Sequence, residues 1–165
     1  MQTRTAEGTS TSIPAGGTRR EWAWTPALTD TPVHHPELAA VYRAWSKHRR
    51  GGSLPAVTDF SIDDLAPWLG RISIAKATGN DFEVELLGCS LVDAAGKEIS
   101  RVMLSDSKPG PVGVNARDML ETVTGMGIVA LPCGTSEWRG QSIGWHGIAL
   151  PLAGNAAMIC LFTVH

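Results

Sequence analysis

A predicted helix runs directly into a predicted strand within residues 54–76, and this junction constrains the fold more than any other stretch of the chain. Ser61 followed three residues later by Asp64 resembles the capping box that opens a helix, and Pro67 predicts that this helix ends early. Residues 71–77, RISIAKA, then alternate isoleucines with other side chains, as a strand with one buried face does. We therefore expect short elements of both kinds in an α+β domain.

Four further segments have the pattern of strands. Residues 82–88 alternate apolar side chains with glutamates, and the turn sequence TGND at residues 78–81 joins them to the preceding strand as an antiparallel hairpin. Three more strands are predicted near Ile128, from about Ser142 and from Ala156. In the last of these, apolar side chains point to both faces, which predicts a central position in the sheet.

Three further segments are predicted to be helical. The first begins at Pro36, which suits the first position of a helix, and its apolar stripe follows the helical period: Leu38, Val41, Tyr42 and Trp45. The second is short and covers residues 89–96. The third spans about residues 115–124, again with an apolar stripe: Ala116, Met119, Leu120 and Val123. Together the patterns predict a five-stranded antiparallel sheet with helices on one face and an N-terminal helix available for the other.

The stripe of the first helix is a candidate interface. An apolar face of this size needs either a partner or a cover from the same chain. We therefore expect a homodimer formed through this helix and the exposed face of the sheet, with Leu38, Val41, Tyr42 and Trp45 as interface residues. Packing of the same stripe on its own sheet is the alternative.

Composition indicates the extent of the domain and which classes of partner are disfavoured. Of 165 residues, residues 1–30 are predicted as a disordered tail, because the first part is rich in Thr, Ser, Gly and Ala, and residues 31–165 as one domain. Trp22 and Trp24 are spaced as in an extended segment that packs on the domain or on a partner. A net charge of −2 disfavours nucleic acid, and the lack of a long apolar run disfavours a membrane, so we expect a cytoplasmic protein.

The order and spacing of these motifs resemble those of a PAS domain, and specifically of the PAS-like family common as short single-domain proteins in alphaproteobacteria. The resemblance covers residues 36–163 and rests on four segments, at residues 35–60, 63–74, 85–100 and 148–162. The chain departs from the family at Cys89, where Thr is usual, and at Arg101, where Gly is common. The second departure changes the expected shape of the loop near Ser100, because Gly tolerates backbone angles that Arg does not.

The resemblance implies a hollow between the sheet and the helices, which either accepts a small molecule or is filled by side chains. Its expected lining is Leu91, Met119, Val123 and Trp145. No cofactor is identified. Haem is disfavoured because residues 115–124 contain no histidine, and flavin photochemistry because no Asn-Cys-Arg-Phe motif is present and Cys89 is no substitute.

Metal and catalytic signatures are weak. His34 and His35 are adjacent and lack acidic or thiol neighbours at ligand spacing, so no metal site is predicted, and the three cysteines lack a CxxC pair. His146 with Asp93 or Glu98 is the one acid/base pair we consider, and its imidazole is also a candidate pH sensor.

We expect a non-catalytic sensory or regulatory domain that senses a small ligand or binds an unidentified signalling protein. The alternatives are a small α+β enzyme that uses a histidine–carboxylate pair in its cavity, and a constitutive structural adaptor. An enzyme is disfavoured because the chain has no GxSxG elbow, no HExxH motif and no phosphate-binding glycine loop.

Overall fold

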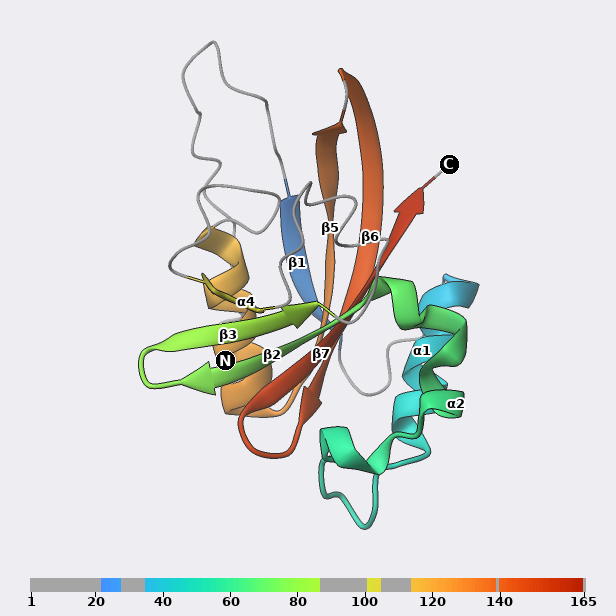
Figure 1. Ribbon diagram of the computed structural model, residues 1–165, viewed down its shortest axis with the longest axis vertical. Coiled ribbons are helices and arrows are strands. Elements are labelled where there is room, and N and C mark those ends of the chain that lie inside the picture. Colours follow the sequence, from blue (N-terminus) through green and yellow to red (C-terminus); the bar gives the residue numbers. More distant parts are fainter. Residues whose placement is uncertain (1–21, 28–34, 87–100, 105–113, 139, 165) are drawn as a thin grey trace, which may run out of the picture.

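The computed structural model describes residues 22–27, 35–86, 101–104, 114–138 and 140–164, which form an α+β fold built on one antiparallel sheet (Figure 1). The helices are α1 (Pro36–Ser46), α2 (Ile62–Leu65) and α4 (Val114–Met126), with 3-10 helices at Val57–Asp59 and Ala66–Arg71. The strands are β1 (Trp22–Ala27), β2 (Ile72–Thr78), β3 (Asp81–Leu86), β4 (Arg101–Met103), β5 (Val129–Trp138), β6 (Gln141–Leu152) and β7 (Ala156–Val164).

The sheet has seven strands in the order β1-β5-β6-β7-β2-β3-β4. The expected number of five is therefore wrong, although the α+β class and the antiparallel pairing are confirmed. The strands expected from the sequence occupy five adjacent places, and β7 lies in the centre, as its two apolar faces predict. β1 and β4 extend the sheet at its two edges. Because β1 pairs with β5 along Trp22–Ala27, these six residues belong to the domain rather than to the predicted tail.

The junction between α2 and β2 forms as the local sequence predicts, with one difference. The Ser61 hydroxyl accepts from the amide of Asp64 at 3.2 Å, and the Asp64 carboxylate accepts from the amide of Ser61 at 2.8 Å. Pro67 does not end the helical path. It occupies the start of the 3-10 helix Ala66–Arg71, where proline needs no amide partner, and this helix leads directly into β2.

One face of the sheet is covered by α1 and the segment around α2. The buried cluster on this face, called the α1 cluster below, combines large side chains of several strands with the helix: Leu38, Val41, Trp45, Ile72, Val129, Ile148, Leu150, Leu152, Ala156, Met158, Cys160 and Phe162. Trp45 is 1% exposed, and its indole Nε1 donates to the carbonyl of Pro151 at 2.9 Å. Indole nitrogens need such a partner when they are buried.

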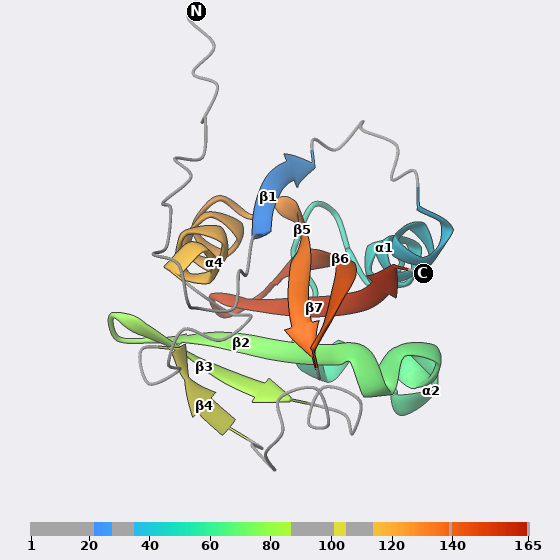
Figure 2. The same cartoon turned by 90° about the horizontal axis from the view of Figure 1, so that it is seen from above.

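The opposite face is covered by α4, and Figure 2 shows α1 and α4 on either side of the strands β5 and β6. The buried cluster on this face, called the α4 cluster, pairs alanines of the sheet with larger side chains of the helix and the β3–β4 edge: Ala75, Phe82, Leu104, Ala116, Met119, Leu120, Val123, Ala130, Ala149 and Ala157. Because α1 and α2 lie together on the other face, the short helix at Ser61 is not on the same face as α4.

Three of the four residues of the expected homodimer stripe belong to the α1 cluster, so the prediction that they form an interface is corrected. Leu38, Val41 and Trp45 are 4%, 1% and 1% exposed in a single chain. Tyr42 is partly buried, and its ring lies 5.6 Å from that of Trp45. The stripe is thus covered by the chain's own sheet, which was the alternative. The helix predicted at residues 89–96 lies outside the described residues.

Candidate functional site

A polar cavity lies between the tip of the β2–β3 hairpin and α4. Its volume is about 390 Å³, and it is lined from two elements that are far apart in the sequence: Ala77, Gly79, Asn80, Asp81, Phe82, Arg117 and Glu121. The hairpin turns through Gly79 and Asn80, and Gly79 has a φ of 60°, which a glycine adopts without strain. Buried Phe82 supplies the apolar part of the lining.

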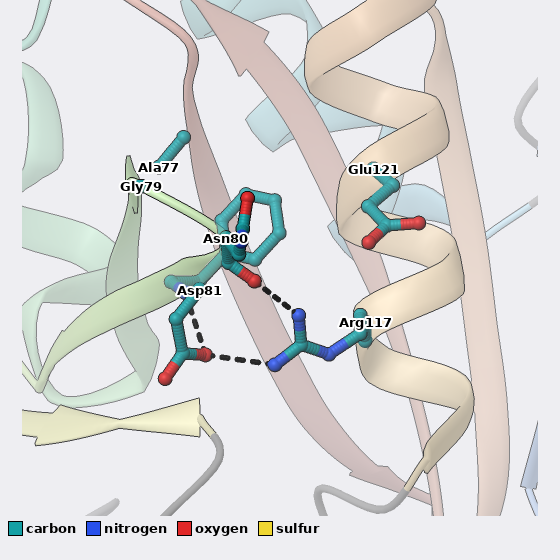
Figure 3. A pocket seen from close by; sticks show the side chains of 7 residues that line it. Ala77, Gly79, Asn80, Asp81, Arg117 and Glu121 are labelled. Atoms are coloured by element: carbon teal, nitrogen blue, oxygen red, sulfur yellow. Dashed lines mark hydrogen bonds and ion pairs between the residues drawn. The ribbon is translucent and has the colours of Figure 1, made fainter.

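Arg117 bridges the hairpin and α4 across this cavity (Figure 3). Its Nη1 donates to the carbonyl of Asn80, and its Nη2 donates to Oδ1 of Asp81 at 3.0 Å. The same carboxylate oxygen accepts from the amide of Phe82 at 2.8 Å. The Arg117 side chain is 37% exposed and that of Asp81 is 17% exposed, so solvent reaches the pair. We call these contacts the Arg117 clamp.

The cavity offers hydrogen-bonding groups of both signs. Arg117 supplies guanidinium donors, whereas Asn80 supplies a carbonyl acceptor and Asp81 a carboxylate. Glu121, one turn further along α4, also lines the cavity and lies above Arg117 in Figure 3. A small polar molecule with both donors and acceptors suits such a lining better than an apolar one.

Of the four predicted pocket residues, the three that the structure describes do not line this cavity. Met119 and Val123 are 3% and 0% exposed and fill the α4 cluster. Trp145 is half-buried on β6; the alternation of the strand puts it on the face of Ala149, about 13 Å further along. Leu91 lies outside the described residues.

Sequence reasoning missed the clamp. Its signals were the polar turn TGND and the spacing of Arg117 and Glu121, which places both on one side of a helix. Neither signal indicates that the hairpin and the helix meet. Of the two positions at which the chain departs from the PAS-like family, Arg101 is the first residue of β4 and pairs with Glu85 on β3. The other, Cys89, lies outside the described residues.

A second polar group surrounds His146 on β6. Its Nε2 lies 3.6 Å from Oε2 of Glu37, and its ring centroid lies 4.1 Å from that of His35. The atom is buried and has no hydrogen-bond partner, because 3.6 Å is too long for a hydrogen bond. Burial, and next the neighbouring His35, hold the pKa of His146 below its ordinary value of 6.5, although Glu37 acts in the opposite direction.

The carboxylate beside His146 is thus Glu37, which the sequence did not suggest. Asp93 and Glu98, the two predicted partners, lie outside the described residues. On β7, Phe162 lies 6.0 Å from the His146 ring, and the Arg71 guanidinium lies over the Phe162 ring at 5.3 Å.

The described residues contain no group of three or more His, Cys, Asp or Glu side chains that could hold a metal ion. Within the same residues, no helix has both the length and the apolar character needed to cross a membrane. The Cys160 thiol is buried in the α1 cluster, and burial raises its pKa to about 12, so it is protonated near neutral pH. Comparisons of the chain with protein-family models, with curated proteins and with solved structures found no match in any of the three.

Proposed function

We propose that the chain is a non-catalytic, PAS-like sensory or regulatory domain that binds a small polar ligand in the cavity at the Arg117 clamp. The observation that carries the proposal is the clamp itself, in which a partly exposed arginine ties a hairpin to a helix across a cavity of about 390 Å³. Two features support the PAS-like architecture: the five adjacent strands β5-β6-β7-β2-β3, and helices on both faces of the sheet.

The ligand acts by competing for the groups of the clamp. A carboxylate or similar acceptor on the ligand pairs with Arg117, and its donors pair with Asp81 or Glu121. Such a ligand binds most tightly when the hairpin and α4 have separated enough to admit it. Binding therefore shifts the population toward that arrangement, because only a difference in affinity between two arrangements moves an equilibrium.

α4 transmits this shift to the sheet. Its buried side chains, Met119, Leu120 and Val123, lie directly on the α4 face, so a displaced helix alters the contacts across β2, β6 and β7. The described residues form no separate output module, and we propose that another protein reads the change. A homodimer and a cytoplasmic location stay predictions, and a dimer would use a surface other than the buried stripe of α1.

Native mass spectrometry of the full chain, purified gently from its own host, tests the proposal. The wild-type protein is expected to retain a small molecule of discrete mass. Arg117→Met, which removes the guanidinium but keeps a long side chain, is expected to lose it. The matched control is Lys76→Met, on the exposed side of β2 and outside the cavity lining, which should retain it.

Two outcomes would contradict the proposal. A wild-type protein without any retained molecule favours the constitutive adaptor. A molecule that Arg117→Met retains as well as the wild type places the binding site elsewhere. The same spectra give the number of subunits, which tests the expected homodimer.

A further inference from the structure

We propose that His146, His35 and Glu37 form a pH-sensitive contact that fastens the first turn of α1 to β6 when the His146 imidazole is neutral and loosens it on acidification. The contact is far from the clamp in the chain and uses none of its residues. It therefore goes beyond the proposed ligand site, and the failure of either leaves the other intact.

The geometry joins the helix to the sheet at one point. His35 is the residue that precedes α1, Glu37 lies in its first turn, and His146 lies on β6 beneath them. The two imidazole centroids are 4.1 Å apart with the rings tilted by 51°, so the rings are in direct contact. The side chain of His146 is 12% exposed and its Nε2 is buried, so solvent has little access to the closed contact.

Protonation makes this contact unfavourable. A proton on His146 places a cation directly beside the His35 ring, with its Nε2 buried away from solvent. Both lie at the N-terminal end of α1, where the helix dipole is positive and disfavours cations. Glu37 supplies one negative charge at 3.6 Å, and its side chain is 60% exposed, so solvent weakens its compensation.

The other groups around His146 do not offset this charge. On β5, Cys133 is the cross-strand partner of His146 and carries a thiol. On β7, the nearest ring is that of Phe162, and the buried thiol of Cys160 lies one position further along the face in its neutral form. From the end of the 3-10 helix, Arg71 adds a further positive charge over Phe162.

The direction of the pH dependence follows from the lowered pKa of His146. Above its ordinary value of 6.5 the imidazole is neutral in both the folded and the unfolded chain, so the contact contributes fully. As the pH falls below 6.5, the unfolded or locally opened chain takes up the proton more readily than the folded one. The stabilisation from the contact is therefore lost from about pH 6.5 downward, until the folded form is protonated as well.

Only the first turn is expected to open. Further along α1, Val41 and Trp45 are each 1% exposed, and the indole is bonded to Pro151. These contacts contain no group that titrates near neutral pH, so they hold the rest of the helix. The amide of Ala39, which donates to the His35 carbonyl at 2.9 Å, reports the first turn, and that of Lys47, bonded to the Arg43 carbonyl at 3.1 Å, reports the last.

Amide hydrogen exchange followed by NMR at about pH 7.5 and about pH 5.5 tests the proposal on the full chain, after correction for the intrinsic pH dependence of exchange. In the wild type, the opening constant at Ala39 is expected to rise severalfold at the lower pH, while that at Lys47 changes little. The imidazole resonances of His146 should titrate below pH 6.5, with the Ala39 resonance following the same midpoint.

Substitutions separate this contact from general acid effects. His146→Gln, which is neutral at every pH, is expected to abolish the rise at Ala39, and the matched control His48→Gln, at the other end of α1, to leave it unchanged. If His146→Gln does not fold, Glu37→Gln serves instead: without the compensating carboxylate, the rise at Ala39 should be larger than in the wild type. Equal opening of the wild type at both pH values, or an unchanged rise in either His146→Gln or Glu37→Gln, would overturn the proposal.

Discussion

The two faces of the sheet achieve burial in opposite ways. On the α1 face the strands supply large side chains, such as Ile148, Leu150 and Met158, and α1 adds one large anchor, Trp45. On the α4 face the strands supply alanines, and α4 and the β3–β4 edge supply the volume. Four of these alanines, on four different strands, are 0% exposed: Ala75, Ala130, Ala149 and Ala157.

The register of the sheet groups the alanines. Ala75 lies directly opposite Ala157, and Ala130 lies directly opposite Ala149. Small side chains over neighbouring strands leave a shallow surface on which the side chains of α4 can lie. We infer that α1 is held by an anchor with one specific hydrogen bond, whereas α4 is held by packing over the alanines. The two faces should therefore respond to different substitutions.

The largest effect is expected from the anchor. Trp45→Ala removes the most voluminous fully buried side chain and leaves the carbonyl of Pro151 without its indole donor. We expect the free energy of unfolding to fall by about 3–5 kcal/mol. Urea unfolding followed by circular dichroism measures it, with the exposed neighbour Ser46→Ala as the control.

A second substitution separates the contribution of the Trp45 hydrogen bond from that of its apolar volume. Trp45→Phe keeps most of the apolar volume but not the donor, so the expected loss is about 1–3 kcal/mol. A loss from Trp45→Ala no greater than that from Ser46→Ala would mean that α1 is not anchored at this point, and the contrast between the two faces would fail.

The next effect is expected on the α4 face, where added volume rather than lost volume is harmful. A Cβ at Gly147 of β6 would lie 2.5 Å from Cδ2 of Leu161 and 2.8 Å from the carbonyl oxygen of Cys160, and the second of these is backbone that cannot easily move. Gly147→Ala should therefore lower the free energy of unfolding by about 1–3 kcal/mol.

Gly144, three residues earlier on β6, is the matched control. A Cβ there would meet only Val164 at 3.7 Å, which is ordinary contact. Gly144→Ala is expected to be neutral or to stabilise by up to about 1 kcal/mol, because alanine loses less backbone entropy on folding. Similar losses in both variants, measured by the same unfolding experiment, would show that the close approach at Gly147 is not a constraint.

Much of this contrast follows from local sequence patterns. The period of α1 predicts its apolar stripe, and the alternation of β2, β3 and β7 predicts strands, because both patterns repeat over several residues. β4 has only three residues, too few for a period to be detected. The pattern also cannot tell a stripe that meets its own sheet from one that meets a second copy, since both bury the same side chains.

The polar sites were harder to predict for a related reason. Arg117 and Asp81 are separated by 36 positions, and the contact between them depends on how α4 crosses the hairpin. His146 was recognised as a titratable group, but its neighbours His35 and Glu37 come from the start of α1. Such pairings depend on the tertiary arrangement, which neither helical nor strand periodicity specifies.

The smallest loss in free energy of unfolding is expected at the Arg117 clamp. The size of this loss tells whether the clamp or the packing of α4 on the sheet holds the helix in place. Arg117→Met removes two hydrogen bonds, one of which is also an ion pair, but the Arg117 side chain is more than one third exposed, so solvent already offsets most of their value. The expected loss in free energy of unfolding is about 1 kcal/mol or less, and it should shrink further as salt is added. Lys76→Met, on the exposed side of β2, controls for the loss of one positive charge. A loss well above this expected value would mean that the clamp, and not the fit against the alanines alone, positions α4. A small loss means that Arg117 can exchange Asn80 and Asp81 for the groups of a ligand at little cost, because the fold does not depend on them.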